Sequence, residues 1–128
     1  MTRPVINGMR ERNFGRIVNI SSINGQKGQL GLTNYCSAKA GMTGFTRALA
    51  LESARKGVTV NAIAPGYIKT DLLAGVSEDV MKSIVGQIPI GRLGEADEVA
   101  RCVVFLAADA SAWITGSTLT INGGQLMH

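Results

Sequence analysis

The fold is decided by Arg16-Ile17-Val18-Asn19-Ile20-Ser21-Ser22, a short run of β-branched residues typical of a buried strand, which ends on two hydroxyls. A long helical segment follows to about residue 56, where Gly57 closes it, and a second strand is expected at residues 58–64. Further helices lead to a third strand at residues 116–121. This βαβαβ order predicts an α/β fold in which right-handed crossovers build a parallel sheet with helices on both faces.

The remaining segments complete this pattern. Residues 4–12 are expected to form a short amphipathic helix, and residues 77–86 a further helix capped by Ser77. Another helix opens with acidic residues at positions 95–98, where the helix dipole favours them. The glycine-rich residues 23–33 are expected to form an irregular surface loop at the end of the first strand, a place where sites are often found.

The long helix carries the strongest packing signals. Thr33 or Asn34 is expected to be its N-cap. Two mid-helix glycines, Gly41 and Gly44, each cost about 1 kcal/mol relative to alanine, so they are expected to permit close approach by another backbone. Its predicted buried stripe consists of Ala38, Met42, Phe45, Leu49 and Ala50.

Composition limits the function classes. The 128 residues are 45% hydrophobic and 17% charged, which indicates a single globular domain. The net charge of +4 is scattered and only 5% of residues are aromatic, so nucleic-acid binding has no motif behind it. No apolar run approaches the ~20 residues of a membrane helix, and a signal peptide is not expected.

The cysteine and histidine content argues against a metal site. Cys36 and Cys102 do not have metal-ligand spacing, and His128 is the only histidine. Both thiols are expected to be reduced, in a cytoplasmic protein.

Polar residues gather at the edge of the sheet formed by the carboxyl ends of the strands, where such sheets bind ligands. Ser22 ends the first strand, and Tyr35 and Lys39 lie four residues apart on the next helix, so they share one face. A cation beside a phenol stabilises the phenolate and makes the tyrosine a usable acid. Ser22 could therefore bind a carbonyl oxygen, Tyr35 could protonate it, and Lys39 could tune the phenol. No side chain delivers hydride, so carbonyl reduction would need a nicotinamide cofactor.

These residues have the pattern of a known family. Ser22, the Tyr35-x-x-x-Lys39 motif thirteen residues later, Pro65-Gly66 after the next strand and Asn122-Gly123-Gly124 after the last are all present. In this combination the chain resembles the C-terminal half of the short-chain dehydrogenase/reductase family. The resemblance implies a Rossmann-type sheet, a carbonyl-orienting role for Ser22, a proton-donating role for Tyr35, and a role for Lys39 in tuning the phenol and binding the nicotinamide ribose.

The resemblance also implies a cofactor and a substrate. Pro65, Gly66, Ile68 and Thr70 would line the nicotinamide and pyrophosphate, with NADPH the expected cofactor and NADH the alternative. Within the family the chain looks closest to acetoacetyl-CoA reductases, with the 3-oxoacyl-ACP reductases close behind, which suggests a CoA- or ACP-carried 3-oxoacyl thioester as substrate. Gln29 and Tyr67 are the expected substrate contacts. Family members usually form homodimers or homotetramers through the helix that carries Tyr35.

The chain also departs from the family pattern. The family's Gly-rich phosphate turn, its cofactor-selecting residue and its catalytic Asn belong upstream of Met1. Residues 1–128 are therefore expected to be a single partial domain that lacks the N-terminal nucleotide-binding half and is inactive alone. Its first strand is expected to have an open, apolar edge. A non-catalytic association module is the alternative of another class.

Overall fold

β2 (Val58–Pro65) is the central strand of a three-stranded parallel sheet, between β1 (Gly15–Ile20) and β3 (Thr118–Ile121). The structure is a computed structural model that describes residues 1–127. β1 and β2 are paired from Gly15 opposite Val58 to Ile20 opposite Ile63. All seven residues from 58 to 64 are buried, which requires cover on both faces of β2.

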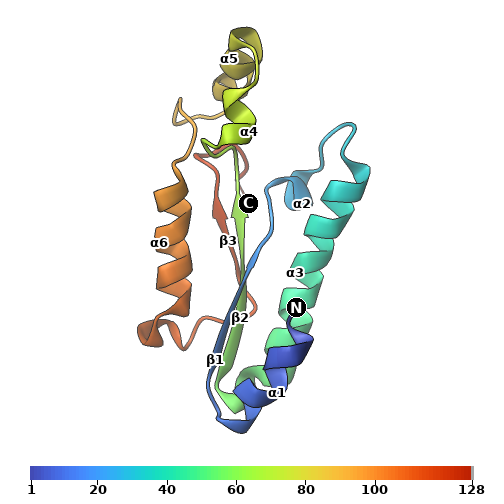
Figure 1. Cartoon of the computed structure of the whole chain (residues 1–128), viewed down its shortest axis with the longest axis vertical. Helices are drawn as coiled ribbons and strands as arrows, with labels where there is room; N and C mark the ends of the chain where they lie inside the picture. Colours follow the sequence, from blue (N-terminus) through green and yellow to red (C-terminus); the bar gives the residue numbers. More distant parts are fainter. Residues whose placement is uncertain (128) are drawn as a thin grey trace.

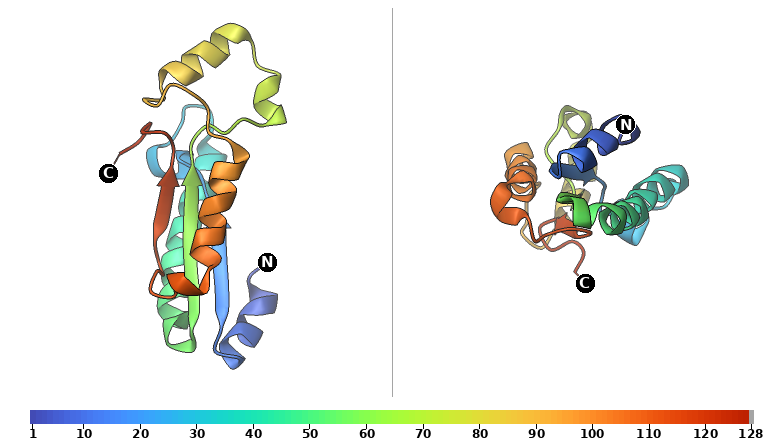
Figure 2. Two further views of the ribbon diagram at one scale, coloured as in Figure 1. Left: turned by 90° about the vertical axis from the view of Figure 1, so that its left-hand side faces the viewer. Right: turned by 90° about the horizontal axis from the view of Figure 1, so that it is seen from below.

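Helices supply that cover, so the fold is a three-layer α/β arrangement (Figures 1 and 2). The long α3 (Thr33–Ser53) and the short α1 (Arg3–Glu11) lie on one face, and α6 (Ala96–Ala107) lies on the other. The remaining elements are α2 (Asn24–Lys27), the 3-10 turn η1 (Ala54–Lys56), α4 (Asp71–Ala74), α5 (Glu78–Gly86) and the 3-10 turn η2 (Asp109–Ser111). The predicted α/β class and parallel sheet are confirmed.

The apolar core on the α3 side joins the amino-terminal ends of the strands to the helices. Its buried members are Ile6, Ala50, Val58 and Val60, and the half-buried Met9, Ile17 and Leu49 pack against them. Burial of this kind stabilises the fold by roughly 25 cal/mol per Å² of apolar surface. This core holds α1 and α3 against the amino-terminal part of the sheet, away from the carboxyl ends of the strands.

The predicted irregular loop at residues 23–33 is wrong in part, because its first residues form α2. Ile23 continues the pairing with β2 through a hydrogen bond from its N–H to the Pro65 carbonyl, 2.9 Å long. Gly25 then allows α2 to lie directly on α3, since a Cβ here would come within 2.7 Å of the Lys39 carbonyl carbon. A contact so distant in sequence leaves no signal in the local composition.

The start and the buried face of α3 also differ from the prediction. Leu32 occupies the N-cap position and no side chain caps the helix, so neither Thr33 nor Asn34 is the cap. Ala38 and Phe45, predicted to be buried, are exposed, whereas the buried residues of α3 are Thr46, Ala50 and Ser53.

Hydrogen bonds explain why polar residues occupy this buried face. Thr46 Oγ1 accepts from Asn19 Nδ2 at 2.9 Å, and Ser53 Oγ accepts from the Arg10 guanidinium at 2.9 Å. A buried hydroxyl that forms a hydrogen bond does not bear the full cost of losing its contact with water. The hydrophobic pattern did not predict these positions, because it identifies buried residues only by their apolar side chains.

The open edge of β1 is present as expected. Within residues 1–127, β1 pairs with β2 alone, and Ile20 at its end is 42% exposed. Unpaired backbone groups on such an edge can accept another strand.

Candidate active site

Ser22 lies where β1 leaves the sheet. The backbone of this segment stays bound to β2, with the Ser21 N–H donating to the Ile63 carbonyl at 2.7 Å. Ser22 is buried, and its Oγ accepts a hydrogen bond from the Asn24 N–H at 3.1 Å. This bond orients the hydroxyl oxygen and leaves the hydroxyl proton able to bind a carbonyl oxygen.

Tyr35 and Lys39 occupy the first two turns of α3 on one face, as the spacing predicted. Lys39 Nζ lies 5.6 Å from the centroid of the Tyr35 ring, within the range of a cation–π contact. Tyr35 is 44% exposed, so its phenol is accessible. The pair therefore presents a reachable hydroxyl beside a positive charge.

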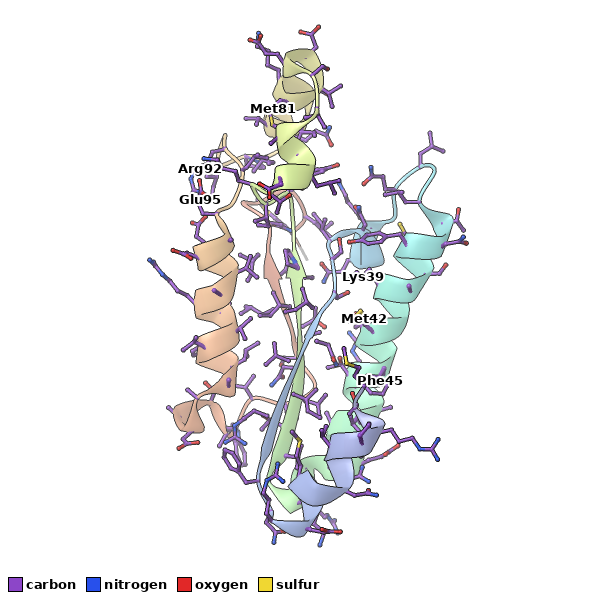
Figure 3. The ribbon with its side chains drawn as sticks, in the orientation of Figure 1. Lys39, Met42, Phe45, Met81, Arg92 and Glu95 are labelled. Carbon is purple, nitrogen blue, oxygen red and sulfur yellow. The ribbon has the colours of Figure 1, made fainter. Side chains whose placement is uncertain are left out.

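Two hydrogen bonds join Lys39 to the end of β1. Lys39 Nζ donates to the Ile20 carbonyl at 2.8 Å, and Ser21 Oγ donates to the Lys39 carbonyl at 2.8 Å. Figure 3 shows Lys39 on the side of α3 that faces the sheet. Ile20 and Ser21 are thus both bound to Lys39, so Ser22, which follows them directly, lies near the start of α3.

The segment after β2 runs beside the turn that follows β3. Gly66 donates from its N–H to the Ile121 carbonyl at 2.8 Å, and a Cβ at Gly66 would come within 2.9 Å of Asn122 Cα. Glycine is required here by the close approach of two backbones. Pro65, which ends β2, accepts the hydrogen bond from Ile23 and so lies next to the Ser22 segment.

Ile68 and Thr70 lie further along the same segment. Ile68 forms an isolated parallel bridge with Gly94. Thr70 is exposed at the N-cap of α4, where its carbonyl accepts from the Leu73 N–H while its side chain forms no capping hydrogen bond. The Thr70 hydroxyl therefore remains available to a ligand.

Of the two expected substrate contacts, Gln29 is linked to Ser22 through Asn24, whereas Tyr67 lies apart from the Ser22, Tyr35 and Lys39 cluster. Gln29 is exposed, and its Oε1 accepts from Asn24 Nδ2 within its own loop at 2.7 Å. Tyr67 lines a separate cavity of about 120 Å³ that none of the three cluster residues lines. Both remain predictions.

Sequence reasoning missed two positions that hold the site together. Ser21, taken only as a strand-end hydroxyl, forms the hydrogen bond to the Lys39 backbone. Gly94 was assigned no role, although a Cβ there would come within 2.7 Å of Ile68 Cδ1. Neither contact had a local signal, because each joins segments 18 or more residues apart.

The part of the chain that the structure describes offers neither a metal-binding cluster nor a membrane-crossing helix. Residues 1–127 contain no group of three or more His, Cys, Asp or Glu side chains that could hold a metal ion. Among the helices of the same residues, none is long and apolar enough to cross a membrane.

Comparison with known proteins identifies the family. A family model described as enoyl-(acyl carrier protein) reductase, one of those of the short-chain dehydrogenase/reductase family, matches residues 1–125. The chain belongs to the short-chain dehydrogenase/reductase family. The prediction from the Ser22, Tyr35 and Lys39 spacing is therefore confirmed at the level of the family.

Individual members of the short-chain dehydrogenase/reductase family are closely similar. Acetoacetyl-CoA reductases of Shinella zoogloeoides and Rhizobium meliloti are each 64% identical over 126 residues, 98% of this chain and 52% of the relative. The 3-oxoacyl-(acyl-carrier-protein) reductase of Pseudomonas aeruginosa is 49% identical over 127 residues, 99% of this chain and 51% of the relative. The chain thus spans about half the length of the curated relatives it matches.

Proposed function

We propose that this chain supplies the proton-donating half of a reductase that converts a 3-oxoacyl thioester to the 3-hydroxyacyl thioester, with acetoacetyl-CoA as the preferred substrate. The observation that supports this most is the position of Lys39, whose Nζ lies over the Tyr35 ring and donates a hydrogen bond to the Ile20 carbonyl at the end of β1. The 64% identity to two acetoacetyl-CoA reductases favours a CoA thioester. A 3-oxoacyl-ACP reductase is the second candidate, favoured by the 49% identical relative.

The residues present fit one end of a nicotinamide cofactor. The Lys39 ammonium and the hydroxyls of Tyr35 and Thr70 are donors suited to ribose and phosphate oxygens. The Gly66 backbone, with no side chain, permits close approach along Pro65, Ile68 and Thr70. When bound, NADPH, or NADH as the alternative, supplies the hydride for the carbonyl carbon.

The side chains carry the proton half of the reaction. Ser22 donates a hydrogen bond to the substrate carbonyl oxygen and holds it near Tyr35. As the carbon–hydrogen bond forms, the carbonyl π electrons move to oxygen, and Tyr35 transfers its hydroxyl proton to that oxygen. Lys39 places a positive charge beside the phenolate that remains, which lowers the energy of that state.

Replacement of Tyr35 tests this proposal. In the full-length protein, Tyr35→Phe is expected to lower kcat with acetoacetyl-CoA by roughly 10²- to 10⁴-fold, because a positioned general acid is lost. The Kd for NADPH is expected to rise by no more than about tenfold, because only one of several donors to the cofactor is lost. Steady-state kinetics and a fluorescence titration of NADPH measure the two effects.

Tyr67→Phe is the matched control, since it removes the same hydroxyl from a residue outside the cluster. It is expected to change KM for the thioester while leaving kcat within about twofold, the behaviour of a binding contact rather than an acid. A kcat for Tyr35→Phe equal to that of the wild type would reject the mechanism.

We further propose that residues 1–128 form a single partial domain of a cytoplasmic homodimer or homotetramer. They are expected to bind the cofactor poorly by themselves, because the sequence contains no Gly-rich phosphate turn. A non-catalytic association module is the alternative of another class. One observation favours association: Gly41 and Gly44 lie exposed on α3, and a Cβ at either would meet no atom within 4 Å in this chain.

A further inference from the structure

The segment that follows β2 is held at one point by the loop before α6. The Lys69 N–H donates to the Gly94 carbonyl at 2.8 Å, and the Gly94 N–H donates to the Tyr67 carbonyl at 3.0 Å. These two bonds form the parallel bridge opposite Ile68. Gly94 therefore binds the backbone on both sides of Ile68, in the middle of the segment proposed to contact the cofactor.

The approach at this bridge is close, and a residue larger than glycine at position 94 would require the Ile68 side chain to turn aside. A Cβ at Gly94 would come within 2.7 Å of Ile68 Cδ1. The Ile68 side chain is half-buried, and its Cδ1 lies against Gly94. A shift of the Gly94 backbone would move Ile68 with it, because both the backbone bonds and the side-chain contact join them.

An ion pair holds the loop on both sides of Gly94. The Arg92 guanidinium donates to both oxygens of Glu98, each at 2.8 Å, and also to the Leu93 carbonyl at 2.9 Å. Glu98 Oε2 accepts from the Glu95 N–H at 2.8 Å, at the start of α6. Residues 93 and 95 are therefore bound by the two partners of one ion pair, and Gly94 lies between them.

Stability alone is a weak reason for this arrangement. The side chains of Arg92 and Glu98 are 54% and 41% exposed, and exposed ion pairs contribute little to the free energy of unfolding. Two parallel hydrogen bonds to a carboxylate, however, fix the geometry of the groups they join. Figure 3 shows Arg92 and Glu95 close together where the loop enters α6.

We propose that Arg92 and Glu98 are positioning residues for the cofactor site, which act by holding Gly94, and through it residues 66–70, in the binding conformation. This inference rests on the proposed function, in which that segment contacts the nicotinamide cofactor. The path is continuous: α6 carries Glu98, Glu98 binds Arg92, the pair holds residues 93 and 95, and Gly94 binds residues 67 and 69.

The test compares Arg92→Gln and Glu98→Gln with Lys82→Gln in the full-length protein. Lys82 forms a more exposed ion pair with Glu78, 3.2 Å long, within α5, where it binds no part of residues 66–70. The Kd for NADPH is measured by fluorescence titration, and amide hydrogen exchange is measured at Lys69 and Gly94 without cofactor.

Both loop variants are expected to raise the Kd for NADPH about tenfold, as displacement of a binding segment by a fraction of an ångström does. Exchange at Lys69 and Gly94 should accelerate, while amides in α3 and β2 keep their protection. Arg92→Lys, which keeps the charge but loses the planar fork, should give an intermediate Kd. Lys82→Gln should match the wild type in both measurements.

Two results would overturn the inference: an unchanged Kd for NADPH in both loop variants, or faster exchange spread equally through α3 and β2, which would indicate a purely structural role. If the wild type binds neither NADPH nor NADH, the proposed function fails. In that case the exchange experiment, which needs no cofactor, still tests whether Arg92 and Glu98 hold residues 66–70 in position. Unchanged exchange at Lys69 in Arg92→Gln would reject that positioning role.

Discussion

At the scale of single residues, the site depends on where side chains are absent as much as on where they are present. Gly25 lets α2 lie on the backbone of Lys39, and Lys39 in turn binds the Ile20 carbonyl. The position of the ammonium group beside Tyr35 is therefore set partly by a residue with no functional group. Glycine is required at position 25 by packing, because the Cβ of any other residue would collide with the backbone of α3.

Gly25→Ala should disturb this contact. Its Cβ would lie 2.7 Å from the Lys39 carbonyl carbon and 2.9 Å from the Ala40 nitrogen, and both are backbone atoms that cannot turn aside. We expect a loss of roughly 1–3 kcal/mol in the free energy of unfolding, measured by urea denaturation. kcat should fall more than the loss of folded protein explains, because Lys39 moves relative to Ile20.

Gly75→Ala is the control, since a Cβ at that glycine would meet no atom within 4 Å. It should leave both stability and kcat near the wild-type values. Equal effects of the two substitutions would mean that contact with α3 is not what requires glycine at position 25.

At the scale of elements, the start of α6 is stabilised by charge. Hydrogen bonds from Arg92, and then from the Glu95 N–H, hold the pKa of Glu98 at about 2, below its ordinary value of 4.5. Because the pKa of this acid is lower in the folded state, its contribution is fully present above pH 4.5 and is lost as the pH falls toward 2. The loop around Gly94 should thus keep its conformation throughout the neutral range.

This pH dependence can be measured by NMR. The side-chain carboxyl signal of Glu98 and the amide signal of Glu95 should titrate together with a midpoint near pH 2, and neither should change between pH 5 and 8. In Arg92→Gln the midpoint should move up toward 4.5, because the largest cause of the lowered pKa is removed. A midpoint near 4.5 in the wild type would contradict the ion pair.

At the scale of the whole molecule, small and apolar side chains lie exposed on α3 and in the segment after α6. α3 shows Gly41, Gly44 and Phe45 to solvent, and Trp113 is 99% exposed beyond α6. α4 and α5 extend beyond the carboxyl ends of the strands (Figure 1). Apolar surface of this extent is typical of proteins that associate.

Gly41→Ala separates the monomer from the assembly. In a monomer, alanine in the middle of an exposed helix should raise the free energy of unfolding by about 1 kcal/mol. If α3 pairs closely with a second copy, the added methyl group should raise the dissociation constant about tenfold, which corresponds to roughly 1.4 kcal/mol. Sedimentation velocity over a range of concentrations measures the association, with Gly75→Ala as the control. An unchanged dissociation constant would exclude α3 as the interface.

The sequence by itself determined the order of the strands and of the main helices, and the family to which the chain belongs. The periods of hydrophobic residues, the Ser77 cap, whose Oγ accepts from the Val80 N–H, and the acidic start of α6 are local signals, and each predicted its element. The spacing of Ser22, Tyr35 and Lys39 likewise indicated the family. Such features are visible in sequence because propensity and side-chain periodicity act over a few residues.

Only the tertiary structure decided which groups meet. It turned Thr46 and Ser53 into the interior where Ala38 and Phe45 were expected, formed α2 within a predicted loop, joined Lys39 to Ile20, and placed Gly94 against Ile68. Each outcome depends on contacts between segments distant in the chain, whose energies arise from close packing and hydrogen-bond partners rather than from local preference.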